Sequence, residues 1–184
     1  MSIRINYSKR TINKSSSNLV LFTNDKYNIS EIKKNISSLE FSYVSDVLKS
    51  SDLKKNLLIF EISSKKKIVL ISIKKDLKIS DIEKLGAEFF VSVNYGKNSE
   101  YFINSDSIIG KTENFLAHFL HGFKLKSYEF KKYKSKKEIR TINVNIFGTK
   151  NIPSKKDQLK FKALEEGTFY ARDLVSEPGN ILHP

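Results

Sequence analysis

Short apolar runs alternate with helical patterns along this 184-residue chain, and this alternation constrains the fold most. The continuous run at 19–23 is typical of a buried strand, and the alternating run at 3–8 is typical of an edge or half-buried strand. The β-branched runs at 56–63 and 66–73 are joined by so few residues that they predict a hairpin. Further strands are expected at 99–105 and 138–148. Strands alternating with helices predict an α/β protein of three layers, in which a mixed sheet is flanked by helices.

Three stretches have helical spacing. In the first, Ser80 is followed three residues later by Glu83, the pattern of a capping box, which predicts a helix start at Ser80. Its expected buried face is formed by Ile82, Leu85, Phe89 and Val93. A second helix is expected from about residue 112 to Gly122, with Phe115, Leu116 and Phe119 on its buried side. Shorter helical turns are predicted near residue 30 and within 44–53.

The longest helical pattern spans residues 154–177, and Pro178 is expected to stop it because proline removes a backbone donor. Its apolar positions are Leu159, Ala163, Leu164, Phe169, Tyr170 and Leu174. We expect the α/β domain to occupy residues 1–150, with its last strand ending near Gly148. Residues 151–184 are then a C-terminal connector helix that leads away from the domain, followed by a junction.

The charge and the cysteine count exclude several function classes. The chain has no cysteine, which rules out disulfides, thiolate metal sites and a cysteine nucleophile. The net charge of +13 is compatible with nucleic-acid binding, but of the 33 basic residues all except Arg4, Arg10, Arg140 and Arg172 are lysine. Arginine is the usual residue of phosphate- and base-reading surfaces, so a solvated lysine surface is the favoured interpretation. No apolar segment reaches membrane-spanning length, and a cytoplasmic protein without a membrane partner is expected.

Few residues form a recognisable chemical site. His118 and His121 are three residues apart on a predicted helix and could share a metal ion, although no further ligand is evident. The competing interpretation places one of them half-buried and the other in solvent. Glu165 and Glu166 are adjacent on a helix, so they point different ways and are expected to be solvated. The Gly148–Lys150 stretch lacks the pattern of a phosphate loop.

Aromatic residues alternate with lysines in the segment YEFKKYKSKK, at 128–137. Stacking faces among cations are what single-strand binders use. Tyr128, Phe130 and Tyr133 directly after a helix are, however, more often packing residues. The packing interpretation is favoured.

Three segments together resemble the leucyl aminopeptidase (cytosol aminopeptidase) family. The segment ARDLVSEPGNILHP, at 171–184, is similar to the motif at that family's domain junction, through Ala171, Arg172, Asp173, Leu174, Val175, Pro178, Asn180, Leu182 and Pro184. The segment HGFKLKSYEFKKYK is similar to the family's Gly-x-x-Leu-x-x-Tyr-x-Phe-x-x-Tyr-Lys pattern, through Gly122, Leu125, Tyr128, Phe130, Tyr133 and Lys134. A third match runs through Leu77 and the step Leu85–Gly86–Ala87. The chain departs from the family at His183, which replaces a threonine, and at residues 71–76, which lack the family's glycines.

The resemblance implies an N-terminal domain with a fold similar to macro domains, which supports hexamer assembly and access to the active sites. It implies a parent enzyme that removes N-terminal amino acids, leucine among them, from peptides with two divalent metal ions, manganese or zinc. The family's metal ligands lie in motifs such as Asn-Thr-Asp-Ala-Glu-Gly-Arg, which this chain lacks. No catalytic, metal-binding or cofactor-binding residue is therefore assigned here. The catalytic domain is expected to follow Pro184, and this chain alone is expected to be inactive.

Two other functions stay open from the sequence. One is a stand-alone, macro-like binding module for nucleic acid or an ADP-ribose-like ligand, with nucleic acid the less favoured partner. The other is an interaction domain, in which the aromatic residues Phe161, Phe169 and Tyr170 of the terminal helix pack on a partner. That function predicts self-association, or local disorder after about Ser154, when the partner is absent.

Overall fold

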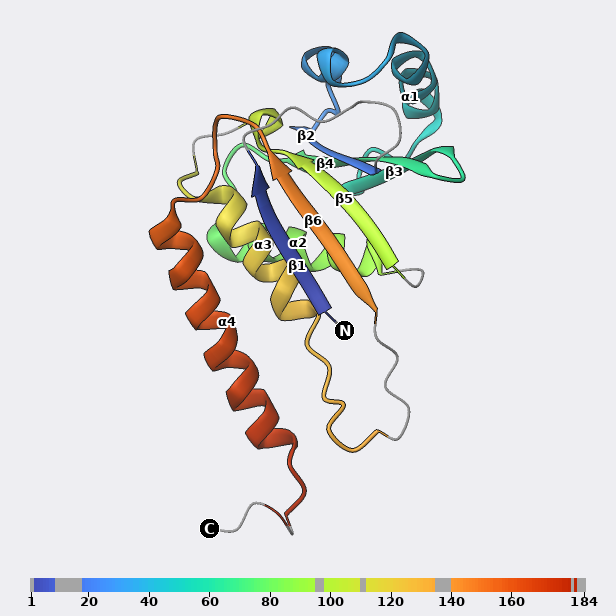
Figure 1. Cartoon of the computed structure of the whole chain (residues 1–184). Helices are drawn as coiled ribbons and strands as arrows, with labels where there is room; N and C mark the ends of the chain where they lie inside the picture. Colours follow the sequence, from blue (N-terminus) through green and yellow to red (C-terminus); the bar gives the residue numbers. More distant parts are fainter. Residues whose placement is uncertain are drawn as a thin grey trace.

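A computed structural model describes residues 2–8, 18–94, 98–109, 112–134, 140–179 and 181. Within these residues, six strands form one sheet in the order β1-β6-β5-β2-β4-β3 (Figure 1). The strands are β1 (Ser2–Ser8), β2 (Asn18–Asn24), β3 (Leu57–Ser63), β4 (Lys66–Ile73), β5 (Asn98–Asn104) and β6 (Thr141–Phe147). Only the hairpin pair β3–β4 is antiparallel, so the sheet is mixed, as the sequence predicts.

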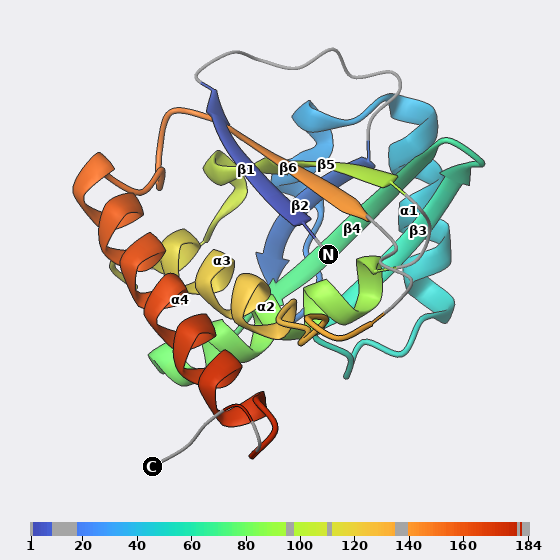
Figure 2. The same cartoon turned by 60° about the horizontal axis from the view of Figure 1, so that its bottom comes forward.

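Helices cover both faces of the sheet. The helices α2 (Ile79–Val93) and α3 (Phe115–Lys126) lie side by side on one face (Figure 2), where their apolar residues pack on side chains of the inner strands. The 3-10 helix η1 (Ser30–Asn35) and α1 (Ser38–Ser50) pack over the other face. Because successive residues of a strand point to opposite faces, Val20 and Phe22 enter the first core while Leu19 and Leu21 enter the second. The predicted three-layer α/β fold is confirmed.

The close contact between α2 and α3 depends on two glycines. A Cβ atom added at Gly86 would lie 1.9 Å from the carbonyl oxygen of Phe119, and one added at Gly122 would lie 1.9 Å from the carbonyl oxygen of Glu83. The two backbones therefore approach closer than any side chain allows. Three of the phenylalanines at this crossing, Phe89, Phe119 and Phe123, are fully buried and in ring contact.

Several element boundaries differ from the predicted ones. The helix expected to start at Ser80 starts at Ile79, and Asp81 rather than Glu83 accepts a hydrogen bond, at 3.2 Å, from the backbone N–H of the cap residue Lys78. The second helix begins at Phe115 rather than 112 and continues past Gly122 to Lys126. A capping box does occur, but at Ser37 and Glu40, where it opens α1 before the stretch 44–53 that was expected to hold a helical turn.

The last helix, α4 (Lys155–Ser176), runs beside α3 and extends beyond the end of the sheet (Figure 1). Ser154 caps it by accepting from the backbone N–H of Asp157, and it ends two residues before Pro178, as predicted. No helix among the described residues is long and apolar enough to cross a membrane. The first residues of the strand predicted at 138–148 lie outside the described residues. Four residues of the segment 171–184 also lie outside them: Asn180, Leu182, His183 and Pro184.

Candidate functional site at the packing of α3 against α4

The N-terminal half of α4 is held on α3 by one buried aromatic ring. Phe161 is buried, and its ring centroid lies 4.9 Å from that of His118 and 5.1 Å from that of His121. These two imidazoles, one helical turn apart on α3, therefore flank the Phe161 ring. The interaction-domain hypothesis placed Phe161 against a partner, whereas here the ring packs on α3 of the same domain.

Each histidine has its own carboxylate. Nδ1 of His118 lies 3.0 Å from Oε1 of Glu83 on α2, and Nδ1 of His121 lies 3.4 Å from Oε1 of Glu165 on α4. The two histidines therefore contact different glutamates on different helices, and their Nδ1 atoms do not converge on one position. Among the described residues there is no group of three or more histidine or acidic side chains that could hold a metal ion. The expectation of one solvated histidine is wrong, because His118 is partly buried and His121 is buried.

Glu165 is the buried charge of this contact. Its Oε2 accepts a hydrogen bond from Nζ of Lys124 at 2.7 Å, so the carboxylate has a lysine on one oxygen and His121 on the other. Its neighbour Glu166 is exposed. The two glutamates point apart as predicted, but the expectation that both are solvated is wrong for Glu165. Its spacing from Phe161 could have indicated this, because residues four apart share a helix face.

A cleft opens between β1, α3 and the first half of α4. Its volume is about 420 Å³, and its walls combine apolar side chains with charged groups. Among the lining residues are Tyr7, Lys124, Leu159, Phe161 and Glu165. Burial, with a further contribution from the charge of Glu165, raises the pKa of Tyr7 to about 12.

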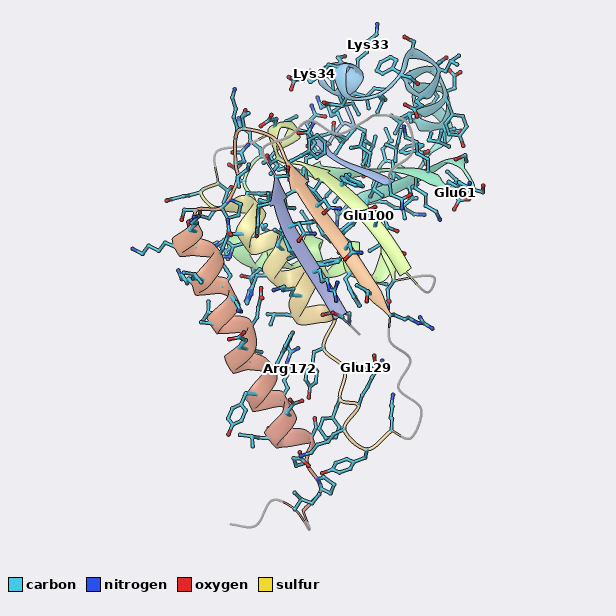
Figure 3. All side chains as sticks on the ribbon, in the orientation of Figure 1. Lys33, Lys34, Glu61, Glu100, Glu129 and Arg172 are labelled. Atoms are coloured by element: carbon cyan, nitrogen blue, oxygen red, sulfur yellow. The ribbon has the colours of Figure 1, made fainter. Side chains whose placement is uncertain are left out.

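The C-terminal half of α4 is fastened to the segment that follows α3. Arg172 donates from Nη1 to the carbonyl oxygen of Leu125 at 2.7 Å, and its guanidinium lies 5.4 Å from the centroid of the Tyr128 ring. The Tyr128 hydroxyl donates to Oδ1 of Asp173 at 2.8 Å, and its ring lies 5.5 Å from Phe169. Figure 3 shows Arg172 between α4 and this segment. Two of the segments that carry the resemblance, 122–134 and 171–178, are thus in direct contact.

Glu177, the residue directly after α4, contacts the same segment. Its carboxylate accepts hydrogen bonds from Lys132 and from the Tyr133 hydroxyl. These two hydrogen bonds lower the pKa of Glu177, and the same carboxylate raises the pKa of Lys132 and of Tyr133. Tyr128 and Tyr133 therefore have partners on or just beyond α4, which supports the packing interpretation over a stacking surface for single-stranded nucleic acid.

The carboxyl ends of the parallel strands are where open α/β sheets bind ligands, so they are the place to look for an ADP-ribose-like site. Here Oδ1 of Asp106 accepts hydrogen bonds from the backbone N–H groups of Thr149 at 2.7 Å and of Lys150 at 2.6 Å. Gly148, with φ of +133°, makes the turn that brings them there. The backbone donors of the Gly-Thr-Lys stretch thus bind a carboxylate of the chain itself.

The fold and this packing define a class: an α/β domain whose last helix, α4, is attached to it near both of its ends. No family model matches the chain. It is 38% identical over 129 residues to a probable cytosol aminopeptidase of Clostridium perfringens, covering 64% of this chain and 26% of that protein. A probable cytosol aminopeptidase of Rhizobium meliloti is 36% identical over 75 residues, which cover 37% of this chain and 15% of that protein. The chain thus spans about a quarter or less of the length of these relatives.

Solved structures agree in fold. A mutant of tomato leucine aminopeptidase superposes with a TM-score of 0.64 at 15% identity, covering all of this chain and 40% of that one. The cytosol aminopeptidase of Coxiella burnetii superposes with a TM-score of 0.58 at 13% identity, and the match covers 95% of this chain and 33% of that one. The chain is similar to the N-terminal domain of the leucyl aminopeptidase (cytosol aminopeptidase) family, so the predicted resemblance is confirmed.

Proposed function

We propose that this chain is the N-terminal, non-catalytic domain of a leucyl aminopeptidase, whose further polypeptide removes N-terminal amino acids from peptides by two-metal hydrolysis. The two divalent ions, manganese or zinc, belong in this proposal to the catalytic domain, and none of the described residues is assigned to them. The domain's own partners are that catalytic domain and, in a hexamer, other copies of the parent. The compartment is the cytoplasm.

One observation carries this proposal: Tyr128 lies between Arg172 and Asp173. These three residues come from the two segments that resemble the family, and their contact fixes the direction in which α4 leaves the domain. With Phe161 held between the two histidines at the other end, α4 is attached at two points. A helix attached in this way has a set direction relative to the sheet, which supports a role in positioning a domain that follows it.

Reading the gene beyond the codon for Pro184 tests this proposal directly. An open frame that encodes a segment similar to Asn-Thr-Asp-Ala-Glu-Gly-Arg is the expected result. A native stop codon directly after Pro184 would contradict it and would favour a stand-alone binding module.

An activity assay provides the biochemical test. The purified 184-residue chain, incubated with leucine p-nitroanilide and Mn²⁺ or Zn²⁺, should release no nitroaniline, whereas the product of the extended frame should. Hydrolysis by the short chain that a chelator abolishes would show that the chain holds its own metal centre. The proposal that the domain is non-catalytic would then fail.

A further inference from the structure

The cleft between β1, α3 and the first half of α4 has the size of a small-molecule site. Its volume of about 420 Å³ lies within the range of about 300–1,000 Å³ that is usual for ligand pockets. Its apolar lining includes Ile5, Leu120 and Phe161, one from each of the three elements. An α-helix with its side chains is about 10–12 Å across, so the cleft is too small to hold one and fits a small molecule better.

The walls of the cleft are held in place by contacts within the chain. Phe161 is buried and flanked by the rings of His118 and His121. Where α4 begins, Nε2 of Gln158 donates to the carbonyl oxygen of the buried residue Pro153 at 2.8 Å. A site whose walls are fixed in advance loses little conformational freedom when a ligand enters, which favours binding.

Apolar surface inside the cleft remains uncovered. Leu159 lines the cleft, yet 68% of its surface is exposed. Tyr7 also lines it and is 37% exposed. Tyr7 lies on the same face of β1 as Ile5, because alternate residues of a strand share a face. A ligand with an apolar body would remove this surface from water, which is favourable.

Positive charge dominates the lining of the cleft. Three lysines and one carboxylate contribute to it: Lys124, Lys155, Lys162 and Glu165. The carboxylate is already bonded to Lys124, which leaves the other two lysines uncompensated by it. Lys155 has no ion-pair partner among the described residues, and Lys162 makes only a loose, exposed pair with Glu166 at 3.8 Å. Both lysines are exposed, so their charge lies at the opening of the cleft and favours an anion.

Tyr7 adds a hydrogen-bond donor to these charges. The hydroxyl makes no hydrogen bond within the part of the chain that the structure describes, and it is close enough to Glu165 for that charge to act on it. A phenol hydroxyl can donate to a carboxylate oxygen. The cleft therefore combines an apolar interior with three groups that can bind one negative charge.

We propose that this cleft binds a small organic anion, a carboxylate on an apolar body. The carboxylate accepts from the ammonium groups of Lys155 and Lys162 and from the hydroxyl of Tyr7, while the apolar body packs against Leu159 and Phe161. This inference goes beyond the proposed function, because it concerns a small-molecule ligand of the described domain and does not depend on the catalytic domain.

A titration followed by heteronuclear NMR of the isotope-labelled 184-residue chain is the first test. The probe is phenylbutyrate, and phenylbutylamine and phenylbutanol are the matched compounds with the same apolar body. Phenylbutyrate should shift the amide signals of Tyr7, Leu120 and Leu159 saturably, with a dissociation constant of about 1 mM or below. The amine and the alcohol should bind at least about tenfold more weakly, because neither carries a negative charge.

Substitutions at exposed positions identify the groups that bind the carboxylate. The double variant Lys155→Gln/Lys162→Gln should weaken binding of phenylbutyrate by about tenfold or more. Tyr7→Phe, which removes only the hydroxyl, should weaken it by about three- to tenfold. The control is Lys75→Gln/Lys156→Gln, which removes the same net charge at two exposed lysines outside the cleft and should leave binding unchanged.

Three results would overturn the proposal. Shifts that do not saturate, or that spread over the surface, would show that the cleft binds no small anion. Equal binding of the amine would show that the charge of the ligand is not recognised. An unchanged affinity in the double variant at the cleft would show that its lysines do not bind the carboxylate.

The same titration of the product of the extended frame distinguishes a small ligand from side chains of a following domain. Unchanged binding of phenylbutyrate is expected. Loss of binding in the longer protein would mean that the following polypeptide fills the cleft, and the proposal would fail. Neither the titration of the 184-residue chain nor its variants bear on what the gene encodes after Pro184, so this proposal and the proposed function fail independently.

Discussion

The ring of Tyr128 lies between two neighbouring residues of α4: its hydroxyl donates to Asp173 at 2.8 Å, and its face receives the guanidinium of Arg172 at 5.4 Å. A tyrosine can make both contacts because its polar and aromatic parts bind different groups. The arrangement couples the direction of α4 to the segment after α3. This contact is also a physical reason why the two segments that resemble the family, 122–134 and 171–178, occur in one chain.

Removing parts of Tyr128 should loosen the end of α4 in steps. Tyr128→Phe keeps the ring beneath Arg172 but loses the hydrogen bond to Asp173, whereas Tyr128→Ala loses both. Amide hydrogen exchange in the last two turns of α4 should therefore be slowest in the wild type, faster in the Phe variant and fastest in the Ala variant. Tyr170→Phe, on the exposed side of the same helix, is the control and should not change exchange. Equal protection in the wild type and the Ala variant would show that Tyr128 does not hold the helix.

The glycines at the α2–α3 crossing should not tolerate alanine. Gly122→Ala places a methyl group 1.9 Å from the carbonyl oxygen of Glu83, so the helices must separate, and we expect a loss of about 3 kcal/mol in the free energy of unfolding. Gly167→Ala places the same methyl group in open space and should stabilise the folded chain by about 0.5–1 kcal/mol. Urea denaturation of both variants gives the comparison. Similar effects of both substitutions would mean that the two helices can separate at little cost.

Much of this fold could be predicted because its signals are local. The buried run at 19–23 became the central strand β2, and the short spacing between 56–63 and 66–73 became the hairpin β3–β4. Helix ends were less predictable, because several residues near each end can serve as caps. The motif Ser80–Glu83 fitted the capping pattern, but the chain uses Lys78 and Asp81.

The packing at α4 could not be predicted from local patterns. Whether Glu165 is solvated depends on Lys124 and His121, which are more than forty residues away in sequence. The same holds for Asp106, whose partners Thr149 and Lys150 follow a different strand. Resemblance to a family indicated that residues 171–178 matter, but only the three-dimensional structure shows that they contact 125–133.

Replacing Glu165 should cost far more than replacing its neighbour. Glu165→Ala removes a buried acceptor from Lys124 and His121 and leaves a cavity beside Phe161, so we expect a loss of about 2–3 kcal/mol in unfolding free energy. Glu166→Ala, one residue along on the exposed side, should change it by less than about 0.5 kcal/mol. Chemical denaturation of the two variants at neutral pH checks the prediction. A small effect at Glu165 would show that water replaces its hydrogen bonds.

The ion pair between Glu40 and the buried Lys66 should make stability depend on acid pH. Burial alone would raise the pKa of Glu40, but hydrogen bonds from Lys66 and Ser37 outweigh it and hold the pKa below the ordinary value of 4.5. A carboxyl group with a lowered pKa in the folded state stabilises that state above its unfolded pKa. This stabilisation disappears as the pH falls through the folded pKa. The free energy of unfolding should therefore decrease as the pH drops below about 4.5.

The variant Glu40→Gln isolates this contribution. Its carboxyl group can no longer titrate, so its stability at neutral pH should be lower and the difference from the wild type should shrink on acidification. Glu31→Gln, an exposed residue on η1, is the matched control and should follow the wild-type curve. Urea denaturation at intervals between pH 3 and pH 7 measures both differences. A difference between Glu40→Gln and the wild type that stays constant across this range would mean that the pair with Lys66 does not govern the acid response.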